Sequence, residues 1–322
     1  MNNLFGYCQL PSGRFVFWAT WLLLVSGIGM RPGIALGEEQ FTVSKKKMLR
    51  IGYSLTTLLA VNPKDAEAAT DVLVGKIADQ KGADITVDTR VFDSVSRMTS
   101  EILAGRLHLV SVLGQEYLDI KKKVVLNTLF VPLRNAGVYE EILLIVRRDV
   151  SNSGLKSLMD KRLLISVSLT NELPYLWLDS ILLSADLPQS REYLGNIEEV
   201  TTPSRTVLPV LFGQADACMT INSAYETLKA LNPQIGEELV ILETSVPLLM
   251  SVLCTTEGMD EELETLVREG IQQLPEYAEG RQLLTLFGVD GHVLFREEYL
   301  EGTKSLIKRA EKLRKEQGLP EL

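Results

Sequence analysis

The sequence is poor in the residues that most catalytic and metal sites use. Its 322 residues include two histidines, His108 and His292, and three cysteines, and their separation along the chain fits no common metal-binding spacing. The sequence contains no Walker A loop, no Gly-x-Gly-x-x-Gly, no Gly-x-Ser-x-Gly and no His-Glu-x-x-His. We therefore expect no catalytic residues, no metal and no cofactor, and an enzyme of similar fold is the least favoured alternative.

Basic charge is also scarce. The chain carries 33 Lys and Arg against 42 Asp and Glu, a net charge of -9 at pH 7, whereas a duplex-binding protein usually shows a basic stripe. Nucleic acid is therefore not expected as a partner. Hydrophobic residues make up 46% of the chain and charged residues 23%, which is enough to fill the cores of two ordinary domains and argues against disorder.

The first 37 residues differ from the rest of the chain. They contain no acidic residue, and the apolar run Phe15–Met30 lies between their two arginines. This run is long for a signal peptide and short of the roughly 20 residues that a membrane-spanning helix needs. Ala35 and Gly37 are small residues at the spacing that signal peptidase accepts. We interpret residues 1–37 as a cleaved signal for export to the periplasm; the alternative is an uncleaved anchor.

The cysteines leave two alternatives open. Cys8 would be lost with the signal, and Cys218 and Cys254 both lie in apolar runs typical of strands. In an oxidising compartment these two could form a disulfide, but buried free thiols are the simpler interpretation and the one we favour.

The rest of the chain alternates short apolar strands with segments of helical periodicity. This order predicts an α/β fold with helices on the faces of its sheets. Long strands near 141–149 and 239–255 join two such units. We therefore predict two lobes with two mixed sheets and a two-strand hinge, the first lobe from residues 48–140 plus 250–322 and the second, with the hinge strands, from 141–249. A ligand would lie between the lobes, where strand ends and helix starts converge.

Candidate ligand-binding residues follow the ends of predicted strands, where helices begin. Free backbone N–H groups and polar side chains at such positions can bind an anion. The alternative is ordinary N-capping of the helices. Arg205 is the strongest single candidate, because a guanidinium at a helix start can bind two oxygens of a carboxylate or a phosphonate. Tyr117 either lines the site or belongs to the core. The candidates are Ser54, Thr56, Thr57, Gln115, Tyr117, Thr170, Asn171, Ser204, Arg205 and Asn222.

Several stretches resemble a known family. Ile102–Val110 followed by Leu113–Tyr117, Leu211–Ala217, and Phe287–Val293 with Tyr299 are similar to passages of the type II periplasmic binding proteins. The resemblance is closest to the phosphate/phosphite/phosphonate-binding group of ABC importers and covers roughly residues 49–310. It implies a two-lobed type II binding-protein fold, a small oxyanion ligand and an inner-membrane permease as partner.

The sequence departs from that family at the ligand-binding loops. The family's Ser-Thr-Ser-Gly run is replaced by Leu169–Glu172, its Ser-His pair by Ser204 and Arg205, and its strand aspartate by His108. Glu172 would repel an anion unless it were protonated or turned away. The resemblance therefore supports the fold and the binding role more strongly than the ligand. A periplasmic sensor that docks on a membrane histidine kinase is the alternative function.

Overall fold

The computed structural model describes residues 46–58, 61–166 and 172–319. The predicted signal, residues 1–37, lies outside the described residues. Within these three ranges, no helix combines the length and the apolar character needed to cross a membrane.

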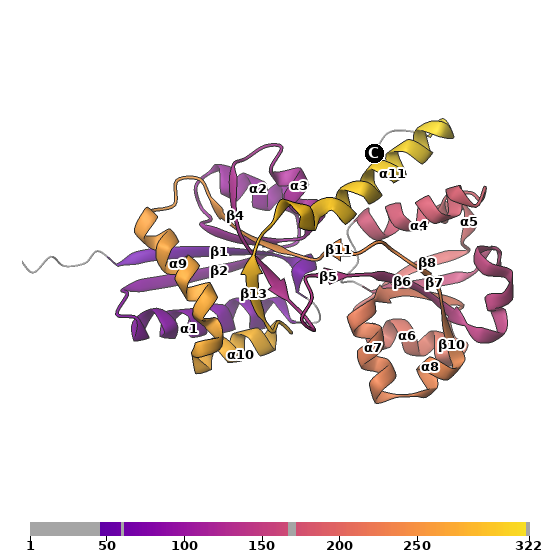
Figure 1. The fold of residues 1–322 in the computed structure, drawn as a ribbon, viewed down its shortest axis with the longest axis horizontal. Helices are drawn as coiled ribbons and strands as arrows, with labels where there is room; N and C mark the ends of the chain where they lie inside the picture. The colour runs from indigo at the N-terminus through magenta and orange to yellow at the C-terminus, as the bar shows by residue number, and fades with distance from the viewer. Residues whose placement is uncertain (1–45, 59–60, 167–171, 320–322) are drawn as a thin grey trace, which may run out of the picture. The chain divides into compact units, whose positions relative to one another are not determined.

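The first sheet has six strands in the order β13-β4-β12-β3-β1-β2 (Figure 1). β1 pairs in parallel with β2 and β3, whereas β12 runs antiparallel to β3 and β4, and β13 runs antiparallel to β4. The sheet is therefore mixed, which confirms the prediction. Its strands are β1 (Lys47–Ser54), β2 (Ile85–Phe92), β3 (Leu109–Val112), β4 (Leu126–Leu133), β12 (Val252–Thr256) and β13 (Gly291–Leu294).

Helices cover both faces of the first sheet. Leu49 and Ile51 of β1 pack with Val267 of α9 on one face, and Val110 of β3 packs with Met98 of α2 on the other. Figure 1 shows α1 and α10 below the sheet and α2 and α3 above it. Because successive residues of a strand point to opposite faces, each strand contributes to two apolar layers. The helices are α1 (Pro63–Gln80), α2 (Val95–Leu103), α3 (Gly114–Ile120), α9 (Glu261–Gln273) and α10 (Ala278–Leu286).

The second sheet has five strands in the order β10-β6-β9-β7-β8. Alternate residues of β6 again serve opposite faces: Leu144 packs with Trp177 of α4, and Ile145 packs with Val210 of α6. Its strands are β6 (Ile142–Arg147), β7 (Arg162–Ser166), β8 (Asn196–Val200), β9 (Ala217–Ile221) and β10 (Leu239–Thr244). Its helices are α4 (Glu172–Ser184), α5 (Ser190–Tyr193), α6 (Pro203–Leu211), α7 (Asn222–Leu231) and α8 (Gln234–Glu238).

The two connections between the sheets each contain one short strand, and these two strands pair to form a two-stranded ribbon. β5 (Tyr139–Glu140) follows β4 and precedes β6, and β11 (Leu248–Leu249) follows β10 and precedes β12. The two strands pair antiparallel to each other. Two connections therefore join strands of one sheet to strands of the other, and one short strand of the ribbon lies on each of them.

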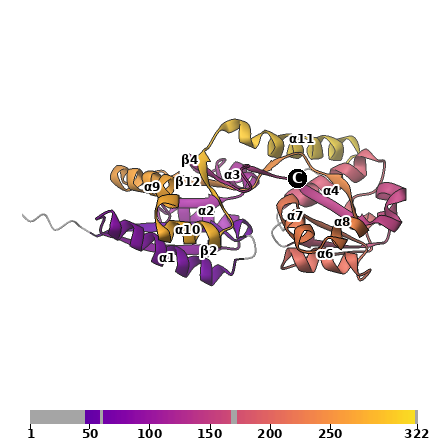
Figure 2. The same cartoon turned by 60° about the horizontal axis from the view of Figure 1, so that its bottom comes forward.

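The C-terminal helix packs with the second sheet. The sequence pattern predicts that residues 250–322 belong to the first lobe. α11 (Glu301–Glu316) instead places Leu306 in the core that contains Leu178 of α4, and the Arg309 guanidinium donates to Ser184 Oγ at 2.9 Å. The reason is that an amphipathic pattern shows which face of a helix is buried and not which layer covers it. Figure 2 shows α11 extending over α4.

The two cysteines in the described residues are free and buried, which confirms the favoured alternative. Cys218 lies in β9 of the second sheet and Cys254 in β12 of the first, each in a separate apolar core. Burial raises the pKa of the Cys254 thiol to about 12 and that of Cys218 further still. Both therefore act as small apolar core residues.

Candidate functional site

A cluster of hydroxyl groups around a buried carboxylate lies at the carboxyl edge of the first sheet. β1 ends at Ser54, and β3, its parallel neighbour, leads into α3, which carries Glu116. Ser54 Oγ and Thr56 Oγ1 each lie 2.8 Å from Glu116 Oε1. Glu116 Oε2 accepts a hydrogen bond of 2.9 Å from the backbone N–H of Leu113. Glu116 is only 6% exposed, so the carboxylate holds the ends of two strands together.

The hydroxyl protons of this cluster are all used inside it. Each hydroxyl has one proton to donate. Ser54 and Thr56 lie 2.8 Å from each other as well as from Glu116, and Thr57 donates to the backbone carbonyl of Ser54 at 2.7 Å. The groups that Ser54 and Thr56 can offer to a ligand are therefore lone pairs. This edge is suited to accept hydrogen bonds from a ligand rather than to donate them to an oxyanion.

The other two candidates on α3 are buried. Gln115 is 9% exposed, and its Oε1 atom is buried without a hydrogen-bond partner in the described part of the chain. The Tyr117 ring packs 6.0 Å from the ring of Phe295 in an apolar core, and burial raises the pKa of its hydroxyl to about 12. Of the two interpretations of Tyr117, its packing matches the core.

The candidates on the second sheet are only partly visible. Thr170 and Asn171 lie outside the described residues. Glu172, which the sequence placed beside the ligand, is the first residue of α4 and is exposed. The binding role of Thr170 and Asn171 therefore stays a prediction.

Arg205 lies in the first turn of α6, two residues after Pro203. Thr202 caps this helix by accepting a 3.3 Å hydrogen bond from the backbone N–H of Arg205. Ser204 Oγ lies 3.2 Å from Thr202 Oγ1. The Arg205 side chain is exposed, and its guanidinium forms no ion pair or hydrogen bond with the residues that the structure describes. The guanidinium of Arg205 and the positive end of the α6 dipole therefore lie close together.

Asn222 begins α7 directly after β9, as the sequence predicted. Its backbone N–H donates to the carbonyl of Glu141 at 2.9 Å, and the next N–H, that of Ser223, donates to Glu140 Oε2 at 3.2 Å. A protein carboxylate therefore already occupies this helix start. We expect Asn222 to act through its side chain and not as part of a free anion-binding turn.

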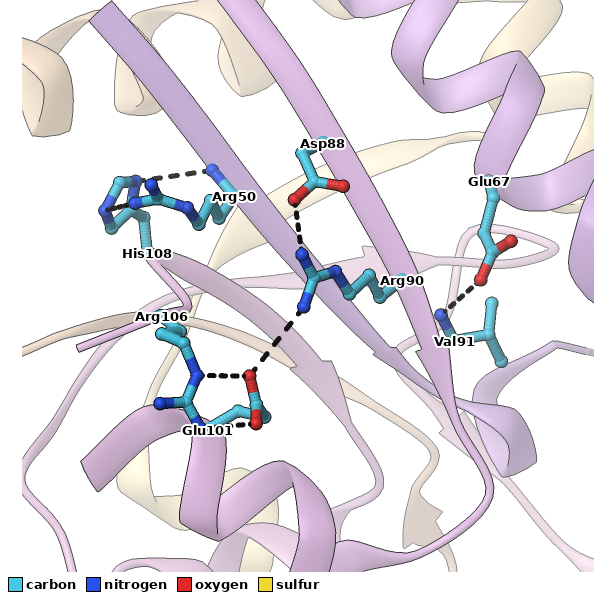
Figure 3. Close-up of polar contacts among 8 residues, drawn as sticks. All are labelled: Arg50, Glu67, Asp88, Arg90, Val91, Glu101, Arg106 and His108. Atoms are coloured by element: carbon cyan, nitrogen blue, oxygen red, sulfur yellow. Dashed lines mark hydrogen bonds and ion pairs between the residues drawn. The ribbon is translucent and has the colours of Figure 1, made fainter. Parts of the chain in front are cut away.

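His108, which replaces the family's aspartate, lies next to Arg50 and not at the carboxyl edge. Figure 3 shows it near the amino end of β3, where its Nδ1 accepts from the backbone N–H of Arg50 at 3.3 Å. Burial, and secondarily the charge of Arg50, lower the pKa of His108. Figure 3 also shows Arg106 in a double hydrogen bond with Glu101. These contacts hold β1, β3 and α2 together and leave His108 a structural role.

Glu116 is the residue of this edge that sequence reasoning missed. Its position three residues into a helix is typical of a capping residue. The signal that could have revealed it is its place after a buried strand that is parallel to the strand ending at Ser54, two residues before Thr56. Among the described residues, no group of three or more His, Cys, Asp or Glu side chains is arranged to hold a metal ion.

Three solved structures have a fold similar to that of this chain. XAC2383 from Xanthomonas citri, bound to ATP, is 18% identical with a TM-score of 0.62, and the match covers 84% of this chain and 98% of that one. A binding protein component of an ABC phosphonate transporter from Pseudomonas aeruginosa is 10% identical with a TM-score of 0.60, over 82% and 87%. PhnD1 from Prochlorococcus marinus, in complex with methylphosphonate, is 14% identical with a TM-score of 0.59, over 82% and 98%.

These structural matches show the fold, which is that of two-lobed periplasmic binding proteins. A comparison with curated protein sequences gave no match. The family model described as "ABC transporter, phosphonate, periplasmic substrate-binding protein" matches residues 55–299, well over half of the chain. The match includes α3 and α6, which carry Glu116 and Arg205. The protein therefore belongs to the periplasmic substrate-binding proteins of the phosphonate ABC transporters.

Proposed function

We propose that the protein delivers a small oxyanion, such as phosphate, phosphite or a phosphonate, to an inner-membrane ABC permease. The ligand would lie between the two lobes, at the carboxyl edges of their sheets. Membership of an ABC-transporter family supports import over the alternative of sensing through a histidine kinase. No catalytic step is part of this proposal.

The observation that carries the proposal is Arg205 at the start of α6, which has no ion pair or hydrogen bond through its guanidinium within the described residues. An exposed guanidinium that has no acidic partner in the described residues is available to a ligand. Its planar fork matches two oxygens of a phosphonate or carboxylate, and the helix start adds positive potential. Ser204, in the same turn, can add a hydroxyl.

The cluster of Ser54, Thr56 and Glu116 points to the other end of the ligand. Its hydroxyls present lone pairs beside a buried carboxylate. A ligand group that meets them must donate hydrogen bonds, as a protonated amine or a hydroxyl does. We therefore propose that the preferred ligand combines an oxyanion with a donor group, as 2-aminoethylphosphonate does.

Replacing Arg205 by glutamine is expected to weaken binding of 2-aminoethylphosphonate about 10- to 100-fold, because a charge-assisted hydrogen bond to a ligand oxyanion contributes about 1.5–3 kcal/mol. Titration calorimetry of the mature protein would measure this change. Arg191→Gln is the matched control, since Arg191 is another exposed arginine of the second sheet's helices, and its affinity should equal that of the wild type.

The same titration tests the ligand class. We expect 2-aminoethylphosphonate to bind more tightly than methylphosphonate, phosphate, phosphite or acetate. Absence of heat with every one of these compounds would refute the oxyanion proposal. Equal affinity of the Arg205→Gln and wild-type proteins would leave the fold and family intact but remove Arg205 from the site.

Export is expected to remove residues 1–37. Because signal peptidase requires small residues at the first and third positions before the cut, Ala35 and Gly37 predict a mature chain that starts at Glu38. Mass spectrometry of the protein from the periplasm would show this terminus. Ala35→Arg should leave the precursor uncleaved. Gln40→Arg, which lies beyond the cleavage site, should be cleaved like the wild-type protein. A full-length mass for the wild-type protein would favour the uncleaved anchor.

A further inference from the structure

A cavity of about 150 Å³, partly open to the surface, lies within the part of the chain built on the first sheet. Its walls come from the face of the sheet that carries Leu49 and Ile51, and from α1, α9 and α10. Figures 1 and 2 show these helices packed beside that sheet. Well-packed interiors contain few voids larger than a water molecule, so a cavity of this size is a feature to explain.

Most of the cavity wall is apolar. Ile77 of α1, Val267 and Ile271 of α9, and Leu283 of α10 all contribute to it. An engineered cavity of this volume with a Leu, Ile and Phe lining stays free of water and binds benzene. The apolar part of this cavity is therefore large enough for about six carbon atoms.

The cavity wall also includes two residues that each have a buried polar atom with no hydrogen-bond partner among the described residues. Arg134, directly after β4, and His292 of β13 both belong to the wall. The Nε atom of Arg134 and the Nδ1 atom of His292 are buried without a hydrogen-bond partner in the described ranges. Buried polar atoms are nearly always paired, so these two are candidates to bind something absent from the chain itself.

Arg134 in particular lacks an anion. Its guanidinium donates one hydrogen bond of 3.2 Å, to the backbone carbonyl of Phe287, and forms no ion pair within the described residues. Burial lowers the pKa of this guanidinium, although the more distant Glu140 and Asp290 partly oppose the shift. A partly buried charge without a close counterion is unfavourable, and an acidic group on an occupant of the cavity would compensate for it.

We propose that this cavity is a second binding site, for a small amphipathic acid with an apolar body of about six carbon atoms and one acidic group that Arg134 binds. Its wall includes Thr57, which is next to the hydroxyl cluster of the proposed oxyanion site, but it contains none of Ser54, Thr56, Glu116 and Arg205. The residues that enclose the apolar body belong to α1, α9, α10 and the sheet.

Gly270 provides a way to test the cavity without removing any contact. It lies in α9 on the same side as Val267 and Ile271, it is part of the cavity wall, and a Cβ atom there would meet no atom within 4 Å. Gly270→Leu should therefore fill the cavity and also raise the helix propensity. Gly75→Leu in α1 is the matched control, since Gly75 likewise has open space around its Cβ position and is not part of the wall.

The experiment measures binding of hexanoate and hexan-1-ol to the mature protein by NMR titration, together with the melting temperature of each variant. We expect the wild-type protein and Gly75→Leu to bind hexanoate at least tenfold more tightly than hexan-1-ol. Gly270→Leu should bind neither compound and should melt at a higher temperature. Arg134→Gln should bind the two compounds with similar affinity.

Three results would overturn the proposal: no binding of hexanoate to the wild-type protein, binding that Gly270→Leu leaves unchanged, or the same preference for the acid in Arg134→Gln. If Arg134→Gln does not fold, the comparison of Gly270→Leu with Gly75→Leu still decides the question. A parallel titration with 2-aminoethylphosphonate reports on the other site, and its outcome is independent of the hexanoate result.

Discussion

Replacing Glu116 by alanine is expected to lower the free energy of unfolding by about 2–4 kcal/mol. The 6% exposed carboxylate accepts from Ser54, Thr56 and the backbone N–H of Leu113. The two hydroxyls can still pair with each other after the substitution, but the Leu113 N–H loses its acceptor at the start of α3. Urea unfolding followed by circular dichroism would measure the change.

Glu67→Ala is the graded control for this experiment. Glu67 accepts one hydrogen bond of 2.8 Å, from the backbone N–H of Val91, and is partly buried (Figure 3). Its loss should cost about 1 kcal/mol. If Glu116→Ala were no more destabilising than Glu67→Ala, the cluster would not hold the strand ends together in the way its geometry indicates.

Glu116→Gln separates stability from ligand preference. The amide oxygen can still accept from Leu113, so we expect a loss of only about 1 kcal/mol. Its NH₂ group would then face Ser54 and Thr56 and donate to them, which would free the hydroxyl protons for a ligand. The preference for 2-aminoethylphosphonate over methylphosphonate should therefore shrink or reverse. An unchanged preference in calorimetry would exclude the cluster from the ligand site.

The alternation of strands and helices was sufficient to predict the two mixed sheets. It did not reveal β4, because Leu126–Leu133 shows no regular alternation and contains Pro132, and a proline argues against an interior strand. The partner layer of α11 was also beyond reach, since periodicity defines a buried face and not its neighbour. In both cases the missing information is long-range packing.

In the candidate site, too, the sequence predicted the features that depend on local pattern and missed those that depend on long-range packing. Strand ends followed by polar residues drew attention to Ser54, Thr56 and Arg205, because local sequence determines where strands stop and helices start; their part in ligand binding stays a prediction. Glu116 and Arg134 were missed for a different reason. Their chemistry depends on which groups meet them from other strands, as Ser54 meets Glu116 across 62 positions of sequence, and no local pattern encodes such a meeting.

His292 is expected to make the folded state lose stability as the pH falls from 6.5 to 4. Burial lowers the pKa of its imidazole from the ordinary 6.5 to about 4. In this window the unfolded chain binds a proton at His292 and the folded chain does not, so stability rises with pH and falls as acid is added. The shift corresponds to about 3 kcal/mol, lost progressively between pH 6.5 and 4 and complete below pH 4.

The physical cause is the position of His292 in the apolar cavity wall that also contains Arg134. A protonated imidazole there would add a second positive charge to a region of low dielectric. His292→Gln should remove most of this pH dependence. His108→Gln should remove a smaller part, because burial and Arg50 lower the pKa of His108 in the same direction. Unfolding free energies at pH 7, 6, 5 and 4.5 would distinguish the variants. Parallel curves for the wild-type and His292→Gln proteins would show that the acid sensitivity arises from carboxylates and not from this histidine.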